Sequence, residues 1–145
     1  MDSKTVYIHI TGCQHDETGE TTITETHARG QSYWRGNKQY LLYDDTNIIE
    51  GARVATILKI GEEQVVLIRK PPLNQRLEFI PGEDTASLYR TFCGEVDLAI
   101  STTSMQIADY SALQRRVEIN YDLSLNGVPA SHNLLRIDIV ADSDH

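Results

Sequence analysis

Hydrophobic and polar residues alternate along most of this chain with a period of two. Apolar residues occupy every second position in several runs, among them residues 6–10, 96–100 and 117–125. Alternation of this kind is typical of strands in a sheet with one dry face and one wet face. No window of about ten residues or longer keeps a helical period. We therefore expect an all-β protein with at most one short helical turn.

Turn-forming residues separate these runs at short intervals, at Asp16–Gly19, Gly36-Asn37, Gly61-Glu62, Cys93-Gly94 and Asn126-Gly127. The predicted strands lie near residues 4–13, 20–29, 31–35, 38–44, 52–60, 64–70, 75–80, 86–92, 95–103, 105–111, 115–125 and 131–141. Two pairs of these can be single long strands, 20–29 with 31–35 bent at Gly30 and 95–103 with 105–111 bent at Ser104. That reading leaves roughly ten strands.

Two hairpins allow the strand register to be predicted. A two-residue turn at Cys93-Gly94 would place Tyr89 opposite Leu98 and Arg90 opposite Asp97, so that an ion pair forms on the wet face. Because both contacts are chemically sensible, we predict this register.

The same count around Gly36-Asn37 sets Gly30 opposite Tyr43, where an aromatic ring can cover a bare glycine. Both hairpins favour an antiparallel meander. Its edges are removed if the sheet closes, and eight or more strands make a barrel that is either filled or holds one small ligand. We predict a single domain, residues 1–145, that forms such a barrel of roughly 8–10 strands, in preference to a two-sheet sandwich with long crossings.

Composition narrows the partners that this domain can have. The chain has 145 residues and a net charge of −8, which opposes a nucleic-acid partner, and no apolar run is long enough to span a membrane. Two cysteines, Cys13 and Cys93, are too few for a disulfide framework. The first residues lack the apolar run of a secretory signal, so we expect a soluble, cytoplasmic protein.

Several short motifs follow one another in an informative order. Between Leu73 and Ile107 these are Asn74-Gln75-Arg76, Gly82, Tyr89, Thr91, Gly94, Glu95–Ile100 and Thr102-Thr103. Outside that stretch they are Gly30, Tyr33, Tyr40, Tyr43, Thr56–Ile60, Val65–Arg69, Tyr121-Asp122 and His132-Asn133. In order and spacing the chain resembles the YwiB-like family of small bacterial proteins of unknown function. The resemblance implies a lipocalin-like (calycin) β-barrel and carries over no activity, substrate or catalytic residue. The chain departs from the family pattern in a longer insertion at Leu77–Asp84 and in Pro71-Pro72.

Standard catalytic, phosphate-binding, zinc and calcium motifs are absent, and we predict no cofactor, no metal and no catalytic residues. His9 and His27 lie on the first two strands and come close enough to share a metal, but the pattern shows no third ligand, so we interpret them as exposed strand residues. The acidic clusters at Asp16–Glu20 and Asp142–His145 are interpreted as solvated.

The aromatic residues Tyr33, Trp34, Tyr40 and Tyr43 would line a cavity or fill the core, with the core favoured.

Four polar residues are candidate ligand anchors. Tyr89 and Tyr121 fall on the dry face, and Asn133 shares the phase of the apolar residues that follow it. Buried polar groups must be hydrogen-bonded, so these three satisfy one another or converge on a ligand. Arg69 could bind a carboxylate at the barrel rim through two parallel hydrogen bonds, or it could plug the barrel by pairing with an internal acid.

The leading hypothesis is a non-catalytic module that binds a small, partly apolar or amphipathic molecule at the barrel mouth through Tyr89, Tyr121, Asn133 and Arg69. An alternative is a protein-interaction or homo-oligomeric barrel with a filled interior, for example a homodimer, because residues 65–68 are apolar on both faces. A third is a small hydrolase or isomerase, which would need an acid or base of perturbed pKa in a pocket.

Overall fold

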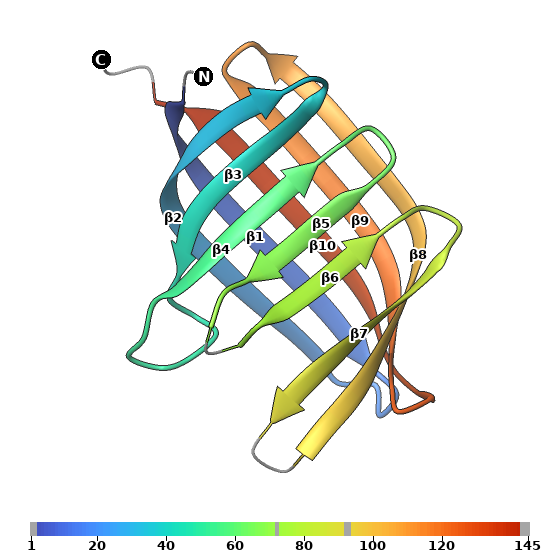
Figure 1. Ribbon diagram of the computed structural model, residues 1–145. Helices are drawn as coiled ribbons and strands as arrows, with labels where there is room; N and C mark the ends of the chain where they lie inside the picture. Colours follow the sequence, from blue (N-terminus) through green and yellow to red (C-terminus); the bar gives the residue numbers. More distant parts are fainter. Residues whose placement is uncertain (1–2, 72, 92–93, 143–145) are drawn as a thin grey trace.

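Ten strands, each antiparallel to its neighbours, make up one sheet in the computed structural model (Figure 1). The structure describes residues 3–71, 73–91 and 94–142, with the backbone alone for residues 89–91. The strands are β1 (Lys4–Asp16), β2 (Thr21–Arg35), β3 (Lys38–Asp45), β4 (Val54–Ile60), β5 (Val65–Arg69), β6 (Gln75–Phe79), β7 (Asp84–Thr91), β8 (Gly94–Ser111), β9 (Gln114–Leu125) and β10 (Val128–Ala141). The described residues include no helix, and hence none that is long and apolar enough to cross a membrane.

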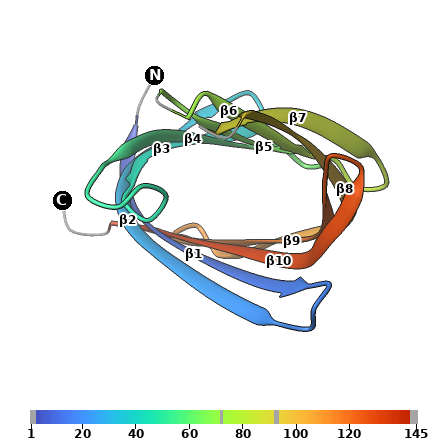
Figure 2. The same ribbon diagram turned by 90° about the horizontal axis from the view of Figure 1, so that it is seen from below.

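The strand order is β6-β5-β4-β3-β2-β1-β10-β9-β8-β7. Strands that follow one another in the sequence are therefore paired, except β6 and β7, and β1 pairs with β10. Seen from below, the sheet curls into a ring that brings β6 back to β7 (Figure 2). These two strands are not joined by a ladder, but the Thr85 hydroxyl donates a hydrogen bond to the Glu78 carbonyl at 2.5 Å. The fold is therefore a nearly closed barrel, and the predicted all-β barrel is confirmed.

The core occupies the inside of the ring. Alternate residues of the strands point inward, as the period of two requires. Their buried members are Val6, Ile8, Leu41, Tyr43, Leu58, Ile60, Val65, Leu67, Phe79, Ile100, Val117, Ile119, Ile137 and Ile139. Burial of these side chains closes the sheet on itself, because their apolar surface has no other cover.

Both predicted bends lie inside continuous strands. β2 runs through Gly30, and β8 runs through Ser104 with a register shift between Thr102 and Ser104 in its pairing with β9. The β2–β3 register is also confirmed, since Arg35 pairs with Lys38 and a Cβ built on Gly30 would lie 3.1 Å from Tyr43 Cβ.

The predicted β7–β8 register was wrong by two residues. Tyr89 pairs with Val96 rather than Leu98, and Arg90 pairs with Glu95 rather than Asp97. Gly94 has a positive φ of 119°, as a turn glycine should, but it takes the first paired position after the turn. Because the shift is an even number of residues, the two strands keep the relative alternation that the prediction gave them.

Candidate functional site

A polar cluster inside the barrel centres on Arg69, the last residue of β5. Its Nη1 donates a hydrogen bond to Gln75 Oε1 at 2.7 Å, and Gln75 itself is buried at the start of β6. The two residues are directly paired across the β5–β6 hairpin, which fixes their side chains on the same face. Arg69 Nε is buried and has no hydrogen-bond partner. An unpaired guanidinium N–H inside a protein is costly, and an acceptor brought by a ligand would satisfy it.

Two buried tyrosines, Tyr43 and Tyr121, lie close enough to this guanidinium for its charge to affect their pKa values. Burial raises the pKa of the Tyr43 hydroxyl far above its usual range, the Asp45 carboxylate adds to the effect, and the Arg69 charge opposes it. Burial also raises the pKa of Tyr121, again against the Arg69 charge. Both hydroxyls therefore stay protonated and neutral across the physiological range. Tyr121 is held in place by an edge-to-face contact with Phe79, with ring centroids 4.9 Å apart.

A pocket of about 360 Å³ opens beside this cluster, at the end of the barrel where β8 begins and β9 ends. Its polar wall consists of Arg69, Gln75 and Tyr121. The remaining lining is aliphatic and is formed by Leu77, Val96, Leu98, Ile100, Leu123 and Leu125. The volume lies at the small end of the range for ligand pockets, and a few polar groups set in an apolar wall are typical of such sites.

The structure brings together two of the four predicted anchors, Arg69 and Tyr121. Asn133 pairs with Tyr121 across the β9–β10 ladder, but it is outside the pocket lining and donates a hydrogen bond to Ser131 Oγ at 3.0 Å. The Tyr89 side chain lies outside the described residues. Sequence reasoning missed Gln75, the third polar residue that lines the pocket. The sequence held two signals for it. Gln75 lies on the same face of its strand as Leu77 and Phe79, and the hairpin around residues 70–74 sets it opposite Arg69.

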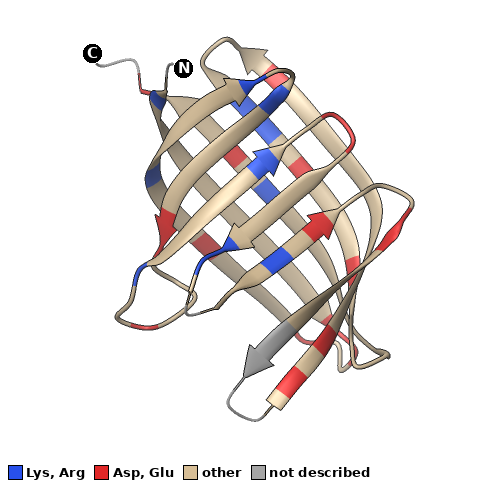
Figure 3. Cartoon of the chain, viewed as in Figure 1, with Lys and Arg blue, Asp and Glu red and all other residues tan. Residues whose placement is uncertain are grey.

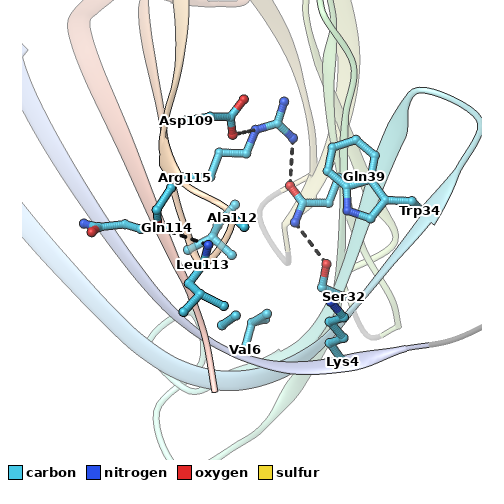
Figure 4. Close-up of a pocket in the computed structure, with 13 residues that line it drawn as sticks. Lys4, Val6, Ser32, Trp34, Gln39, Asp109, Ala112, Leu113, Gln114 and Arg115 are labelled. Atoms are coloured by element: carbon cyan, nitrogen blue, oxygen red, sulfur yellow. Dashed lines mark hydrogen bonds and ion pairs between the residues drawn. The ribbon is translucent and has the colours of Figure 1, made fainter. Parts of the chain in front are cut away.

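A second, smaller pocket of about 150 Å³ lies near the start of β1, and several of its polar lining residues bond to one another (Figure 4). Arg115 lies over the Trp34 ring at 5.0 Å, pairs with Asp109 at 3.1 Å and donates a hydrogen bond to Gln39 Oε1 at 2.9 Å. Gln39 Nε2 in turn donates to Ser32 Oγ at 3.0 Å. The polar groups of Arg115 and Gln39 are thus paired within the protein, although the acid partner, Asp109, is largely exposed.

The predicted aromatic group is divided between the two faces of the sheet. Tyr43 is buried in the core, whereas Tyr33 and Tyr40 stack on the outside with ring centroids 4.9 Å apart. Trp34 keeps an exposed fraction of 49% at the barrel end. The prediction that these four residues together line a cavity or fill the core was wrong, because neighbouring strand positions alternate between faces and only Tyr43 joins the core.

The acidic first turn has a structural role. Asp16 Oδ1 accepts hydrogen bonds from the backbone N–H groups of Thr18 and Glu20 and from the Thr18 hydroxyl. These bonds lower the pKa of Asp16 below its usual value, and the hydroxyl makes the largest contribution. At the other acidic cluster, Asp142 pairs with Arg29 at 2.9 Å, and Asp144 and His145 lie outside the described residues.

The structure places His9 and His27 directly opposite each other on β1 and β2. Their rings stack with centroids 4.2 Å apart. Glu25 lies beside them, with its Oε1 3.6 Å from His9 Nε2. The sequence contained this third residue in the spacing Glu25-x-His27, which puts both side chains on one face of a strand.

Known proteins similar to this chain share its architecture. The sequence model of a family described as a domain of unknown function, DUF1934, matches residues 8–137. The uncharacterized beta-barrel protein YwiB of Bacillus subtilis (strain 168) is 29% identical over 118 residues, which cover 81% of this chain and 80% of that protein. The crystal structure of the ywiB protein from Bacillus subtilis matches with a TM-score of 0.83 at 26% identity, over 97% of this chain and 94% of that one. These likenesses confirm the predicted family resemblance and the β-barrel.

Proposed function

Because this chain belongs to the DUF1934 family, whose function is unknown, we propose from its site alone that it is a non-catalytic module that binds a small, partly apolar molecule at the barrel mouth. The observation that carries the proposal is the Arg69 guanidinium, whose buried Nε lacks a hydrogen-bond partner at the polar wall of an otherwise aliphatic pocket. A carboxylate is the natural complement of this group. The ligand class is therefore a small carboxylate with an aliphatic body.

The chemistry of the polar wall favours binding over catalysis. Its three groups are a guanidinium, a primary amide and a phenol whose pKa is raised by burial. None of them is a base or a nucleophile near neutral pH, whereas each can donate a hydrogen bond. Such a wall orients an anionic head and leaves the chain of the ligand to the leucine-rich side.

Isothermal titration calorimetry with octanoate and 1-octanol tests the proposal. The two compounds have the same number of carbon atoms but only octanoate is charged, so the difference in their affinities reports on the carboxylate. We expect octanoate to bind more tightly, and Arg69→Gln to weaken it by about tenfold or more, since a hydrogen bond to a charged group contributes roughly 1.5–3 kcal/mol. Arg76→Gln is the matched control, because Arg76 lies one position past Gln75 and is exposed outside the barrel. Tyr121→Phe removes one wall donor and should weaken octanoate less.

Absence of binding by either probe would count against the pocket and favour a filled, interaction-type barrel. Equal affinity of the wild type and Arg69→Gln for octanoate would reject the role of the guanidinium.

A further inference from the structure

Four of the five histidines lie on the outer face of the sheet: His9, His15, His27 and His132. They alternate with inward residues, as His9 does with the buried Ile8. They do not all make the same contacts. His132 Nδ1 is paired with the Asp122 carboxylate, and His15 Nδ1 is hydrogen-bonded to the Thr21 hydroxyl at 2.8 Å. His9 and His27 instead face each other, with the Glu25 carboxylate beside them. Asp138 lies opposite His9 on β10, but its carboxylate is paired with Arg116 at 2.6 Å.

We propose that His9, His27 and Glu25 form a binding site for a divalent transition-metal ion, with Zn²⁺ as the representative ion. One ligand atom from each residue lies within 4.8 Å of the other two. Two strands of a continuous ladder hold the three residues, with His9 directly opposite His27 and Glu25 two positions before His27. The backbone therefore fixes the set before any ion arrives. The site lies outside the barrel and does not depend on the interior pocket.

The spacing suits zinc after small side-chain rotations. Zinc–nitrogen and zinc–oxygen bonds of about 2.0–2.2 Å in a tetrahedral arrangement place ligand atoms roughly 3.4 Å apart. His9 Nε2 and Glu25 Oε1, at 3.6 Å, already meet this requirement. The His9 and His27 rings are stacked at an interplanar angle of 11°, and the remaining pairs close the difference by rotation of the exposed His27 and Glu25 side chains. Three protein ligands leave one position for water, as in other two-histidine, one-carboxylate sites.

The donor set selects the kind of ion. Imidazole suits zinc, copper and nickel, whereas calcium needs six or more oxygens and magnesium needs an octahedral oxygen shell. Two neighbouring cations are each paired with an acid, Arg29 with Asp142 at 2.9 Å and Arg116 with Asp138 at 2.6 Å, which reduces their repulsion of a bound ion. The chain carries a net charge of −8, and basic positions are interspersed with acidic ones along the strands (Figure 3).

Titration of tag-free protein with ZnCl₂ in a non-chelating buffer, followed by calorimetry, tests the site. We expect one equivalent to bind, and His27→Gln and Glu25→Gln each to weaken binding at least tenfold. His132→Gln is the matched control, an exposed histidine on the same face that should leave the affinity unchanged. Because His27 and Glu25 are exposed, both variants should keep the melting temperature of the metal-free wild type.

Nuclear magnetic resonance gives a readout that needs no variant. Zinc should shift the ring signals of His9 and His27 and leave those of His132 in place. The proposal is overturned if no stoichiometric binding occurs, if His27→Gln and Glu25→Gln bind as the wild type does, or if His132→Gln abolishes binding.

Discussion

Among the glycines, Gly30 has the least room for a Cβ, and replacing it with alanine tests the packing directly. A Cβ there would lie 2.5 Å from the Leu42 carbonyl oxygen and 3.1 Å from both Ile8 Cδ1 and Tyr43 Cβ. Separations under 3.0 Å are essentially never seen, so the Leu42 backbone must move by about half an ångström. A backbone carbonyl in a sheet cannot swing aside as the end of a side chain can, and the strain therefore falls on the β2–β3 wall.

Overpacking of this kind costs about 1–3 kcal/mol, and the lower chain entropy of unfolded alanine returns about 0.4–1 kcal/mol. We expect Gly30→Ala to lower the free energy of unfolding by about 1–2 kcal/mol. With an unfolding entropy of about 2.1 cal/mol/K per residue, a chain of 145 residues loses about 3–7 °C in melting temperature.

Differential scanning calorimetry on a series of glycine variants gives the comparison. At Gly61 an added Cβ meets its nearest atom, the Gln64 carbonyl oxygen, at 3.4 Å, an ordinary contact, so Gly61→Ala should melt at the wild-type temperature or slightly above it. At Gly12 the close contact is with the Thr24 hydroxyl at 2.8 Å, which can rotate away, so Gly12→Ala should fall between the two. If Gly30→Ala and Gly61→Ala had the same melting temperature, the close approach of β2 and β3 would be refuted.

Two further predictions concern the core and the outer face. Leu41 has an exposed fraction of 0% and its neighbour Leu42 one of 38%. In urea unfolding, Leu41→Ala should therefore lower the free energy of unfolding by about 2–5 kcal/mol, and Leu42→Ala should lower it by no more than about 1 kcal/mol. Equal losses in the two variants would contradict the inward orientation of Leu41 on β3. The hydrogen bond to Asp122 raises the pKa of His132 above its usual 6.5, so this pair stabilises the fold fully below that pH and loses the effect as pH rises through the raised pKa. His132→Gln should accordingly lower the melting temperature in mildly acidic buffer and leave it unchanged in alkaline buffer, and a difference of the same size in both would show that protonation plays no part.

The sequence was most informative where a residue's surroundings follow from its own strand and the next one. The Gly36-Asn37 turn was enough to pair Gly30 with Tyr43, because a two-residue loop leaves one register. The turn before Gly94 misled the count, since a glycine of positive φ can stand inside such a loop or just after it. Strand alternation alone was enough to place Arg69 and Tyr121 on the inner face, where both line the pocket. It could not tell that Asn133 bonds to Ser131 instead of lining the pocket.

The alternation of apolar and polar side chains by itself determined an all-β meander with one dry face, because a period of two buries that face only in a sheet. Closure, in contrast, depended on the summed twist of ten strands and on the pairing of β1 with β10, which join residues at opposite ends of the chain. Only the tertiary structure could place Arg69 of β5 beside Tyr121 of β9, because that contact runs across the barrel and no turn between the two strands fixes it. The sheet curvature also leaves β6 and β7 adjacent but without a ladder between them, next to the pocket that Arg69 and Tyr121 line.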